Sequence, residues 1–203
     1  MTVLKLYNIL AIGLQTTICD IKAKCLLFPT CLDKSQIQVI DFDPIAKSYG
    51  DNIVKQDTPK SVDAITLNKV QNLLILIEKK TWYRFYQYTG TDKSYIDDKI
   101  REYQRELQEK YEATNTICSH FASMENVLKV VPHVYVFLTE IGEIDPTEGF
   151  ATMLGDLALA STFSVSYETV NYTVNSMQMV AEKVSNCRYV YCKDFDKFVG
   201  NLY

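Results

Sequence analysis

Three charged residues in and beside an apolar hairpin are the groups in this sequence best suited to chemistry. Residues 61–80 predict two strands, 62–67 and 72–77, joined by the polar loop 68–71. If Leu67 pairs with Asn72, then Asp63 lies opposite Leu76. Glu78 and Lys80 point to the same face as Asp63, because side chains alternate along a strand. Two carboxylates and an amine on an apolar surface must be solvated, paired or bound to a metal.

These residue types suit metal-dependent hydrolysis of a phosphodiester. Carboxylates are the hard oxygen ligands that Mg²⁺ prefers. A bound metal lowers the pKa of its water and neutralises charge on the phosphate. A nearby ammonium group stabilises the charge that develops in the transition state. The alternative is that residues 78–80 form a solvated strand end and that Asp63 begins an ordinary strand.

The elements expected to position this group follow from periodicity and from strand-forming residue types. Apolar residues recur at helical spacing over 3–22 and, with charged residues between them, over 92–124. Short runs rich in Val, Ile and aromatic residues predict strands. In chain order we expect a helix at 3–22, a strand at 35–42, a polar loop at 45–60, the hairpin, a helix at 92–124 and a strand at 130–140.

The remaining residues predict a loop, a helix at 149–160, a helix from residue 175, a short strand at 187–192 and a terminal helix or tail at 193–203. No internal repeat or linker divides the 203 residues. The expectation is therefore one α/β domain, with a core of about residues 1–141 and a C-terminal α/β extension over 142–203.

The expected order of helix, strand, strand, strand, helix and strand resembles the core of the PD-(D/E)xK nuclease superfamily, which has the restriction-endonuclease-like fold. The matching residues are Asp63 in VDAI and Glu78 and Lys80 in LILIEKK, and the resemblance covers residues 3–140. It implies that Asp63 and Glu78 hold Mg²⁺ or Mn²⁺ and that Lys80 positions or activates the attacking water. The implied activity is hydrolysis of a nucleic acid, DNA in particular.

Two departures from the superfamily pattern keep a second interpretation open. Val62 precedes Asp63, and the nearest earlier proline is Pro59. Residues 1–40 contain no glutamate to supply the acid that many members carry on the first helix. The alternative is a catalytically degenerate member that acts as a protein-binding or nucleic-acid-binding subunit.

Aromatic and basic residues follow the hairpin directly. Lys79, Trp82 and Arg84 begin a stretch that contains four further aromatic residues up to Tyr88. Stacking surfaces beside cations suit single-stranded or distorted nucleic acid. The alternative is an aromatic segment that packs onto the sheet.

Basic residues of the predicted long helix alternate with acidic ones, which predicts a solvated face with intrahelical ion pairs rather than a nucleic-acid-binding stripe. The basic residues are Lys99, Arg101, Arg105 and Lys110.

Three N-terminal cysteines are a weaker candidate for a metal site. Cys19, Cys25 and Cys31 are each separated by five residues, whereas zinc ligands commonly occur in pairs two to four residues apart. Zinc is therefore less favoured than buried thiols.

Composition limits the partners and the compartment. The net charge of −4 argues against tight, unaided binding of nucleic acid and favours a homodimer or a targeting protein partner. No apolar stretch reaches the roughly 18 residues needed to span a bilayer, because Lys5, Asn8 and Gln15 interrupt the largely apolar residues 2–18. These residues predict a buried helix, with a signal peptide as the alternative. We therefore expect no membrane association and a cytoplasmic location, where the six cysteines are reduced.

Overall fold

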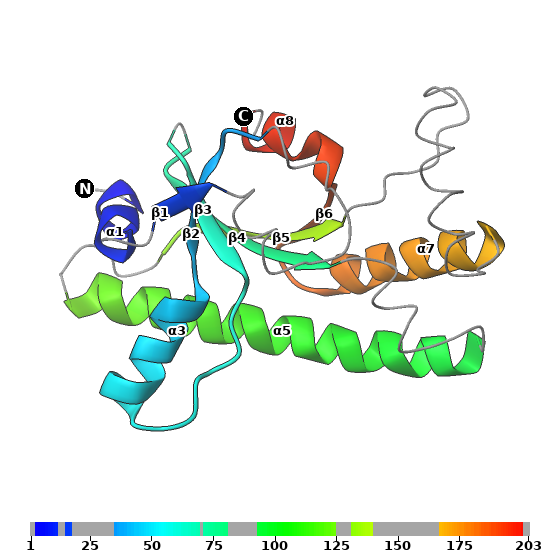
Figure 1. Ribbon diagram of the computed structural model, residues 1–203, viewed down its shortest axis with the longest axis horizontal. Coiled ribbons are helices and arrows are strands. Elements are labelled where there is room, and N and C mark those ends of the chain that lie inside the picture. The colour runs from blue at the N-terminus through cyan, green and yellow to red at the C-terminus, as the bar shows by residue number, and fades with distance from the viewer. Residues whose placement is uncertain are drawn as a thin grey trace.

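The strands form one mixed sheet in the computed structural model, which describes residues 3–11, 15–17, 35–69, 71–80, 93–124, 131–139 and 167–200 (Figure 1). The strands lie in chain order and are β1 (Gln15–Thr17), β2 (Gln38–Asp41), β3 (Ala64–Asn68), β4 (Leu73–Lys80), β5 (His133–Thr139) and β6 (Cys187–Tyr191). Neighbouring strands from β1 to β4 are antiparallel, whereas β4–β5 and β5–β6 are parallel. Each parallel pair requires a crossover. Helices α5 (Lys93–Met124) and α7 (Tyr167–Lys183) lie in these two crossovers.

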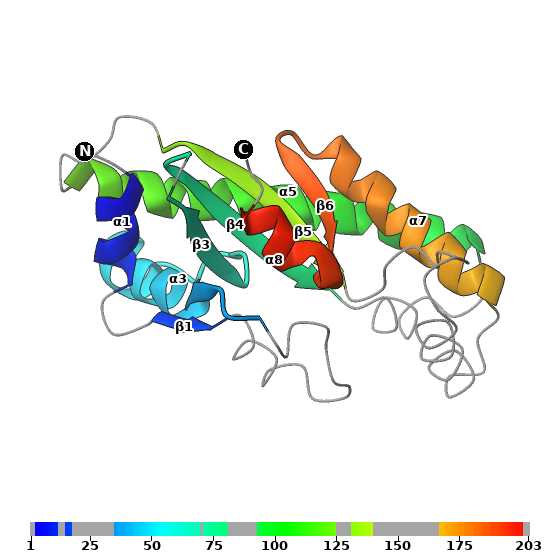
Figure 2. The same ribbon diagram turned by 90° about the horizontal axis from the view of Figure 1, so that it is seen from above.

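Helices cover both faces of the sheet, which confirms the general α/β class. Long helix α5 runs beneath the sheet, with α7 beside it (Figure 1). Helix α8 (Phe195–Gly200) lies across the sheet from α5 (Figure 2). The other described helices are α1 (Val3–Leu10), α3 (Asp43–Tyr49), the π-helical turn η2 (Gly50–Val54) and the 3₁₀ turn η3 (Cys192–Asp194).

Alternation along the strands divides the core into two apolar layers. Ile65 and Phe137 face α5, where Tyr111 is fully buried and stacks on Tyr135 with a centroid separation of 4.0 Å. The opposite layer packs around Phe195 of α8 and includes Ala64, Ile75, Ile77, Val134 and Val136. The α5 layer therefore receives every second side chain of β3 and β4, and Asp63 and Glu78 continue these two series.

The hairpin register differs from the predicted one by two residues. Leu67 pairs with Leu74 rather than with Asn72. The loop still has four residues but begins one residue later, with Asn72 in the left-handed region at φ 54°. Asparagine tolerates this conformation. The side chain of Asn68 accepts a hydrogen bond from the backbone N–H of Gln71 at 2.8 Å, which stabilises the turn.

The sequence prediction is wrong for two other elements. The helix expected over residues 3–22 ends at Leu10, and Gln15–Thr17 instead forms β1. Thr16 and Thr17 are β-branched, and pairing with β2 satisfies backbone groups that a helix would have bonded internally. The loop expected over 45–60 instead contains η2 and most of α3, which starts with Pro44 in its first turn, a position that favours helix initiation.

The other predicted elements agree with the structure within a few residues. The long helix, the strand that follows it and the short strand from Cys187 are confirmed as α5, β5 and β6. Helix α7 begins at Tyr167, earlier than the predicted residue 175. The helix predicted at 149–160 lies outside the described residues. Among the described helices, we find none with the length and apolar character needed to cross a membrane.

Candidate functional site

Asp63 and Glu78 come together at the end of the hairpin that borders α5. Ala64 pairs with Ile77, so the preceding residue Asp63 is level with Glu78 on the neighbouring strand. The side chain of Glu78 is fully buried, and that of Asp63 is half-buried. One carboxylate oxygen of Asp63 accepts a hydrogen bond from the backbone N–H of Lys79 at 2.7 Å. The expected convergence of the two acids on one face is therefore present.

Two lysines contact the same oxygen of Glu78. Nζ of Lys110, from α5, lies 2.7 Å from Oε1, and Nζ of Lys80 lies 3.3 Å from it. The Lys80 ammonium also lies 5.2 Å from the ring centroid of Tyr103, a cation–π contact. Within the described chain, Oε2 of Glu78 has no hydrogen-bond partner although it is buried. The buried carboxylate thus retains one acceptor oxygen that no described group hydrogen-bonds.

Burial raises the pKa of both acids, and the neighbouring charge of Asp63 adds to the effect at Glu78. Loss of hydration is the largest cause at Glu78, and the nearby Asp63 adds to it, which raises the Glu78 pKa to about 7 despite the two lysines. Burial also raises the pKa of Asp63, and the charge of Asp43 adds to the effect. Burial alone would lower the Lys110 pKa, but the charge of Glu78 reverses this and raises it. The ammonium groups of Lys80 and Lys110 therefore lie beside two acids whose ionisation burial disfavours.

Lys110 is the site residue that the sequence analysis missed. We predicted it to lie on a solvated face of the long helix, and this is wrong, because its side chain is only 15% exposed and points to Glu78. Lys110 follows the buried Leu107 by one helical turn and precedes the buried Tyr111. It therefore lies at the edge of the apolar stripe, where a lysine can bury its stem beside the core. The position of Lys110 beside the apolar stripe was the signal in the sequence that could have identified it as a site residue.

The predicted intrahelical pairs elsewhere on α5 are present. Lys99 pairs with Glu102 at 2.6 Å, and Arg101 pairs with Asp98 at 2.7 Å. These two pairs are confirmed as features of a solvated helix face.

Lys79 contributes its backbone rather than its side chain to the acid pair. Its side chain follows that of Glu78 along β4 and therefore points to the opposite face of the sheet, where the residue is 8% exposed. The other two residues expected to contact nucleic acid, Trp82 and Arg84, lie outside the described residues. The three cysteines considered for zinc, Cys19, Cys25 and Cys31, lie outside them as well.

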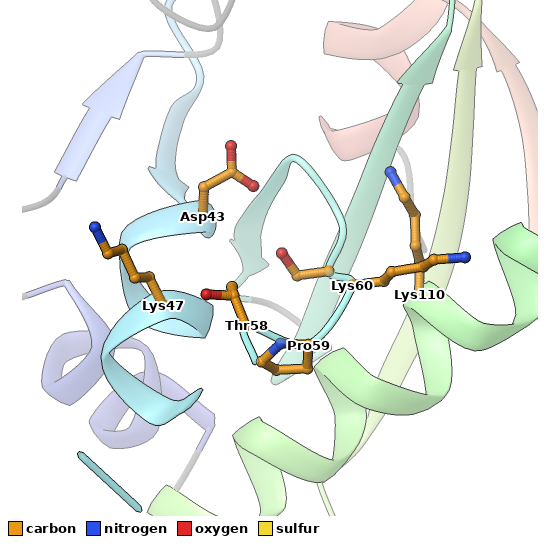
Figure 3. A pocket seen from close by; sticks show the side chains of 7 residues that line it. Asp43, Lys47, Thr58, Pro59, Lys60 and Lys110 are labelled. Atoms are coloured by element: carbon orange, nitrogen blue, oxygen red, sulfur yellow. The ribbon is translucent and has the colours of Figure 1, made fainter. Parts of the chain in front are cut away.

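A cavity of about 350 Å³ opens beside the acid pair and shares Lys110 with it (Figure 3). Its walls come from α3, from the loop that leads into β3, and from α5. The lining residues are Asp43, Lys47, Thr58, Pro59, Lys60, Ser61 and Lys110.

Two contacts fix the loop that forms one wall of this cavity. The backbone N–H of Val62 donates to the hydroxyl of Thr114 on α5 at 3.1 Å, and Thr114 is fully buried. At the other end, Gly50 allows close approach, because a Cβ there would lie 3.1 Å from Cα of Thr58 and 3.2 Å from the carbonyl oxygen of Gln56. The cavity wall is therefore anchored to α5 at one end and to η2 at the other.

We expect Thr114→Val to lower the free energy of unfolding by about 1–3 kcal/mol, because it leaves the buried Val62 N–H without an acceptor. Urea unfolding measures the effect. Thr116→Val is the matched control, since Thr116 is exposed on the same helix and its hydroxyl donates to the backbone carbonyl of Glu112, one turn earlier, at 2.8 Å. Equal losses of unfolding free energy in the two variants would show that the hydrogen bond to Val62 adds no measurable stability.

The acid pair fits a divalent cation by the chemistry of its donors. Asp63 and Glu78 offer oxygen ligands on one face, and the buried Oε2 of Glu78 has an unused acceptor position. Mg²⁺ commonly takes one or two carboxylates and keeps several waters. Among the described residues no group of three or more His, Cys, Asp or Glu side chains is arranged to hold a metal.

Comparisons of the chain with protein-family models, with curated proteins and with solved structures find no match.

Proposed function

We propose that this chain is a metal-dependent nuclease with a restriction-endonuclease-like core. The observation that carries the proposal is the buried Glu78, which lies level with Asp63 on adjacent strands and contacts Lys80 and Lys110. Burial of these charged groups costs stability, and such a cost is common at functional sites, where perturbed pKa values gather. Phosphodiester hydrolysis uses this combination of oxygen ligands and ammonium groups.

The arrangement of the elements supports the same proposal. The described chain contains α1, β2, β3, β4, α5 and β5 in this order, with β1 inserted before β2 and with α3 and η2 inserted between β2 and β3. Apart from these insertions, the order is helix, three strands, helix and strand. Asp63 stands immediately before the second of these three strands, and Glu78 and Lys80 stand near the end of the third. These are the positions at which the superfamily resemblance requires its acids and its lysine.

Each residue has a proposed role. Asp63 and Glu78 hold Mg²⁺ or Mn²⁺, which supplies Lewis-acid polarisation of the phosphate and a water of lowered pKa. Lys80 positions the attacking water or stabilises the charge of the transition state. Lys110 keeps Glu78 in its rotamer through the 2.7 Å contact. We propose DNA as the substrate, reached with the help of a second copy or a targeting partner because the chain carries a net charge of −4.

A second candidate function rests on the position of Lys110. Its ammonium group already lies 2.7 Å from Oε1 of Glu78, where it neutralises the acid without any metal. This contact favours a catalytically degenerate protein that binds a protein or a nucleic acid as a subunit. The two candidates differ in whether a divalent cation binds at the acid pair.

Incubation of the purified protein with linear duplex, circular duplex and single-stranded DNA and with RNA tests the proposal. We expect cleavage of at least one substrate in Mg²⁺ or Mn²⁺ and none in EDTA. Mg²⁺ should also stabilise the protein, by about 1.4 kcal/mol when its free concentration is ten times Kd. Intact substrates together with an unchanged unfolding midpoint in Mg²⁺ would reject the nuclease and leave the binding subunit.

A further inference from the structure

The cavity beside the acid pair has a basic lining in an acidic chain. Three lysines from three separate segments line it with one aspartate, whereas the whole chain has a net charge of −4. Lys60 pairs with Glu109 at 3.1 Å, and both side chains are about half exposed, so this pair is weak. Lys47 forms no ion pair with any described residue. Cationic charge is therefore available to a ligand in the cavity.

The lysines border the cavity on different sides (Figure 3). Lys47 extends outward from α3, Lys60 extends toward α5, and Lys110 runs beside β4. Thr58 lies between them and presents its hydroxyl toward α3, and Ser61 adds a second hydroxyl to the lining. Lysine ammonium groups on flexible stems bind phosphate as point charges, and hydroxyls add hydrogen bonds.

Two charged residues of the cavity lining also act on the acid pair. Lys110 lines the cavity and also contacts Glu78 at 2.7 Å. Asp43 lines the cavity on the α3 side, and its charge contributes to the raised pKa of Asp63. A group bound in the cavity would therefore lie next to the carboxylates rather than at a remote surface.

We propose that this cavity receives a phosphate group of a polynucleotide strand, with Lys47 and Lys60 at its rim and Lys110 between the bound phosphate and Glu78. The identification of the strand rests on the proposed function, whereas the binding of phosphate rests on the lining residues. The cavity volume of about 350 Å³ admits a nucleotide unit, since small-ligand sites occupy ~300–1,000 Å³. Lys110 thereby joins strand binding to the site of hydrolysis.

The test compares two double variants with the same change in net charge. Lys47→Gln/Lys60→Gln removes two cavity lysines, and Lys183→Gln/Lys197→Gln removes two exposed lysines on α7 and α8. Binding of fluorescently labelled single-stranded and duplex oligonucleotides is measured in EDTA over a range of salt concentrations. Wild-type protein is also titrated with inorganic phosphate as a competitor, and the fold of each variant is checked by circular dichroism.

We expect the cavity variant to bind about tenfold or more weakly and to lose about one from the slope of log K against log salt, because the cavity holds one phosphate and each phosphate contact contributes roughly one. The control variant should retain the wild-type slope, and inorganic phosphate should compete far more weakly than unlabelled oligonucleotide. Equal losses in the two variants, or no binding by the wild type, would overturn the proposal. Competition by inorganic phosphate as strong as that by oligonucleotide would overturn the strand as the ligand.

Failure of this inference and failure of the nuclease proposal give different results. Cleavage with unaltered oligonucleotide binding by the cavity variant would reject the cavity and keep the nuclease. Lysine-dependent binding without cleavage in any metal would reject the nuclease and support the cavity as the phosphate site of a binding subunit.

Discussion

Glu78→Gln is expected to reduce metal-dependent cleavage by about a thousandfold or more while the protein remains folded. The substitution retains the shape of the side chain but removes the charge that would hold the metal. A bound metal contributes several kcal/mol to stabilisation of the transition state, and every 1.4 kcal/mol corresponds to about tenfold in rate. Single-turnover cleavage of the best wild-type substrate in Mg²⁺ measures the loss.

Glu182→Gln is the matched control for this experiment. Glu182 is exposed on α7 and accepts a hydrogen bond from Gln178 at 3.0 Å, so its loss should leave cleavage within about twofold of wild type. Lys80→Ala provides a second test should the glutamine variant fail to fold, since removal of this ammonium leaves the Glu78–Lys110 contact in place. Unchanged cleavage in folded Glu78→Gln would place the catalytic centre elsewhere in the chain.

The second large effect is a loss of stability as the pH rises through neutrality. Folding raises the pKa of Glu78 from the ordinary 4.5 to about 7, mainly by burial. Between these two values the folded state binds more protons than the unfolded state, so the free energy of unfolding falls as the pH rises. The difference amounts to roughly 3 kcal/mol, and the raised pKa of Asp63 acts in the same direction.

Urea unfolding in EDTA at about pH 5 and about pH 8 measures this dependence. The wild type should be less stable at the higher pH, and Glu78→Gln should lose most of the difference because it has no proton to release. Mg²⁺ should restore part of the stability of the wild type at the higher pH, since a cation favours the ionised acid. Identical pH profiles for the two proteins would show that Glu78 is not the group responsible.

The local hairpin geometry was predictable because alternation depends only on neighbouring residues. The register prediction was wrong by two residues, yet Asp63, Glu78 and Lys80 remained on one face, since an even shift preserves the orientation of every side chain. An odd shift would have moved them to opposite faces. The candidate catalytic residues could therefore be brought together from the sequence despite the incorrect pairing.

Elements with mixed signals were less predictable. Leu10 ends α1, but apolar spacing continues beyond it in the sequence, so periodicity alone suggested a helix where β1 pairs with β2. Asp43-Pro44 was treated as the end of a strand, although a proline in the first turn also begins helices. In both places a local signal admitted two structures, and pairing or packing with distant residues selected one.

The sequence by itself determined the order of the main strands and helices, the α/β class and the shared face of Asp63, Glu78 and Lys80. These properties follow from hydrophobic periodicity, which is encoded over a few neighbouring residues. Only the tertiary structure decided that Glu78 is fully buried, that Lys110 reaches it from 32 residues away, and that a lysine-lined cavity adjoins them. Desolvation and long-range charge contacts depend on how α5 packs against the sheet, and no local pattern specifies that packing.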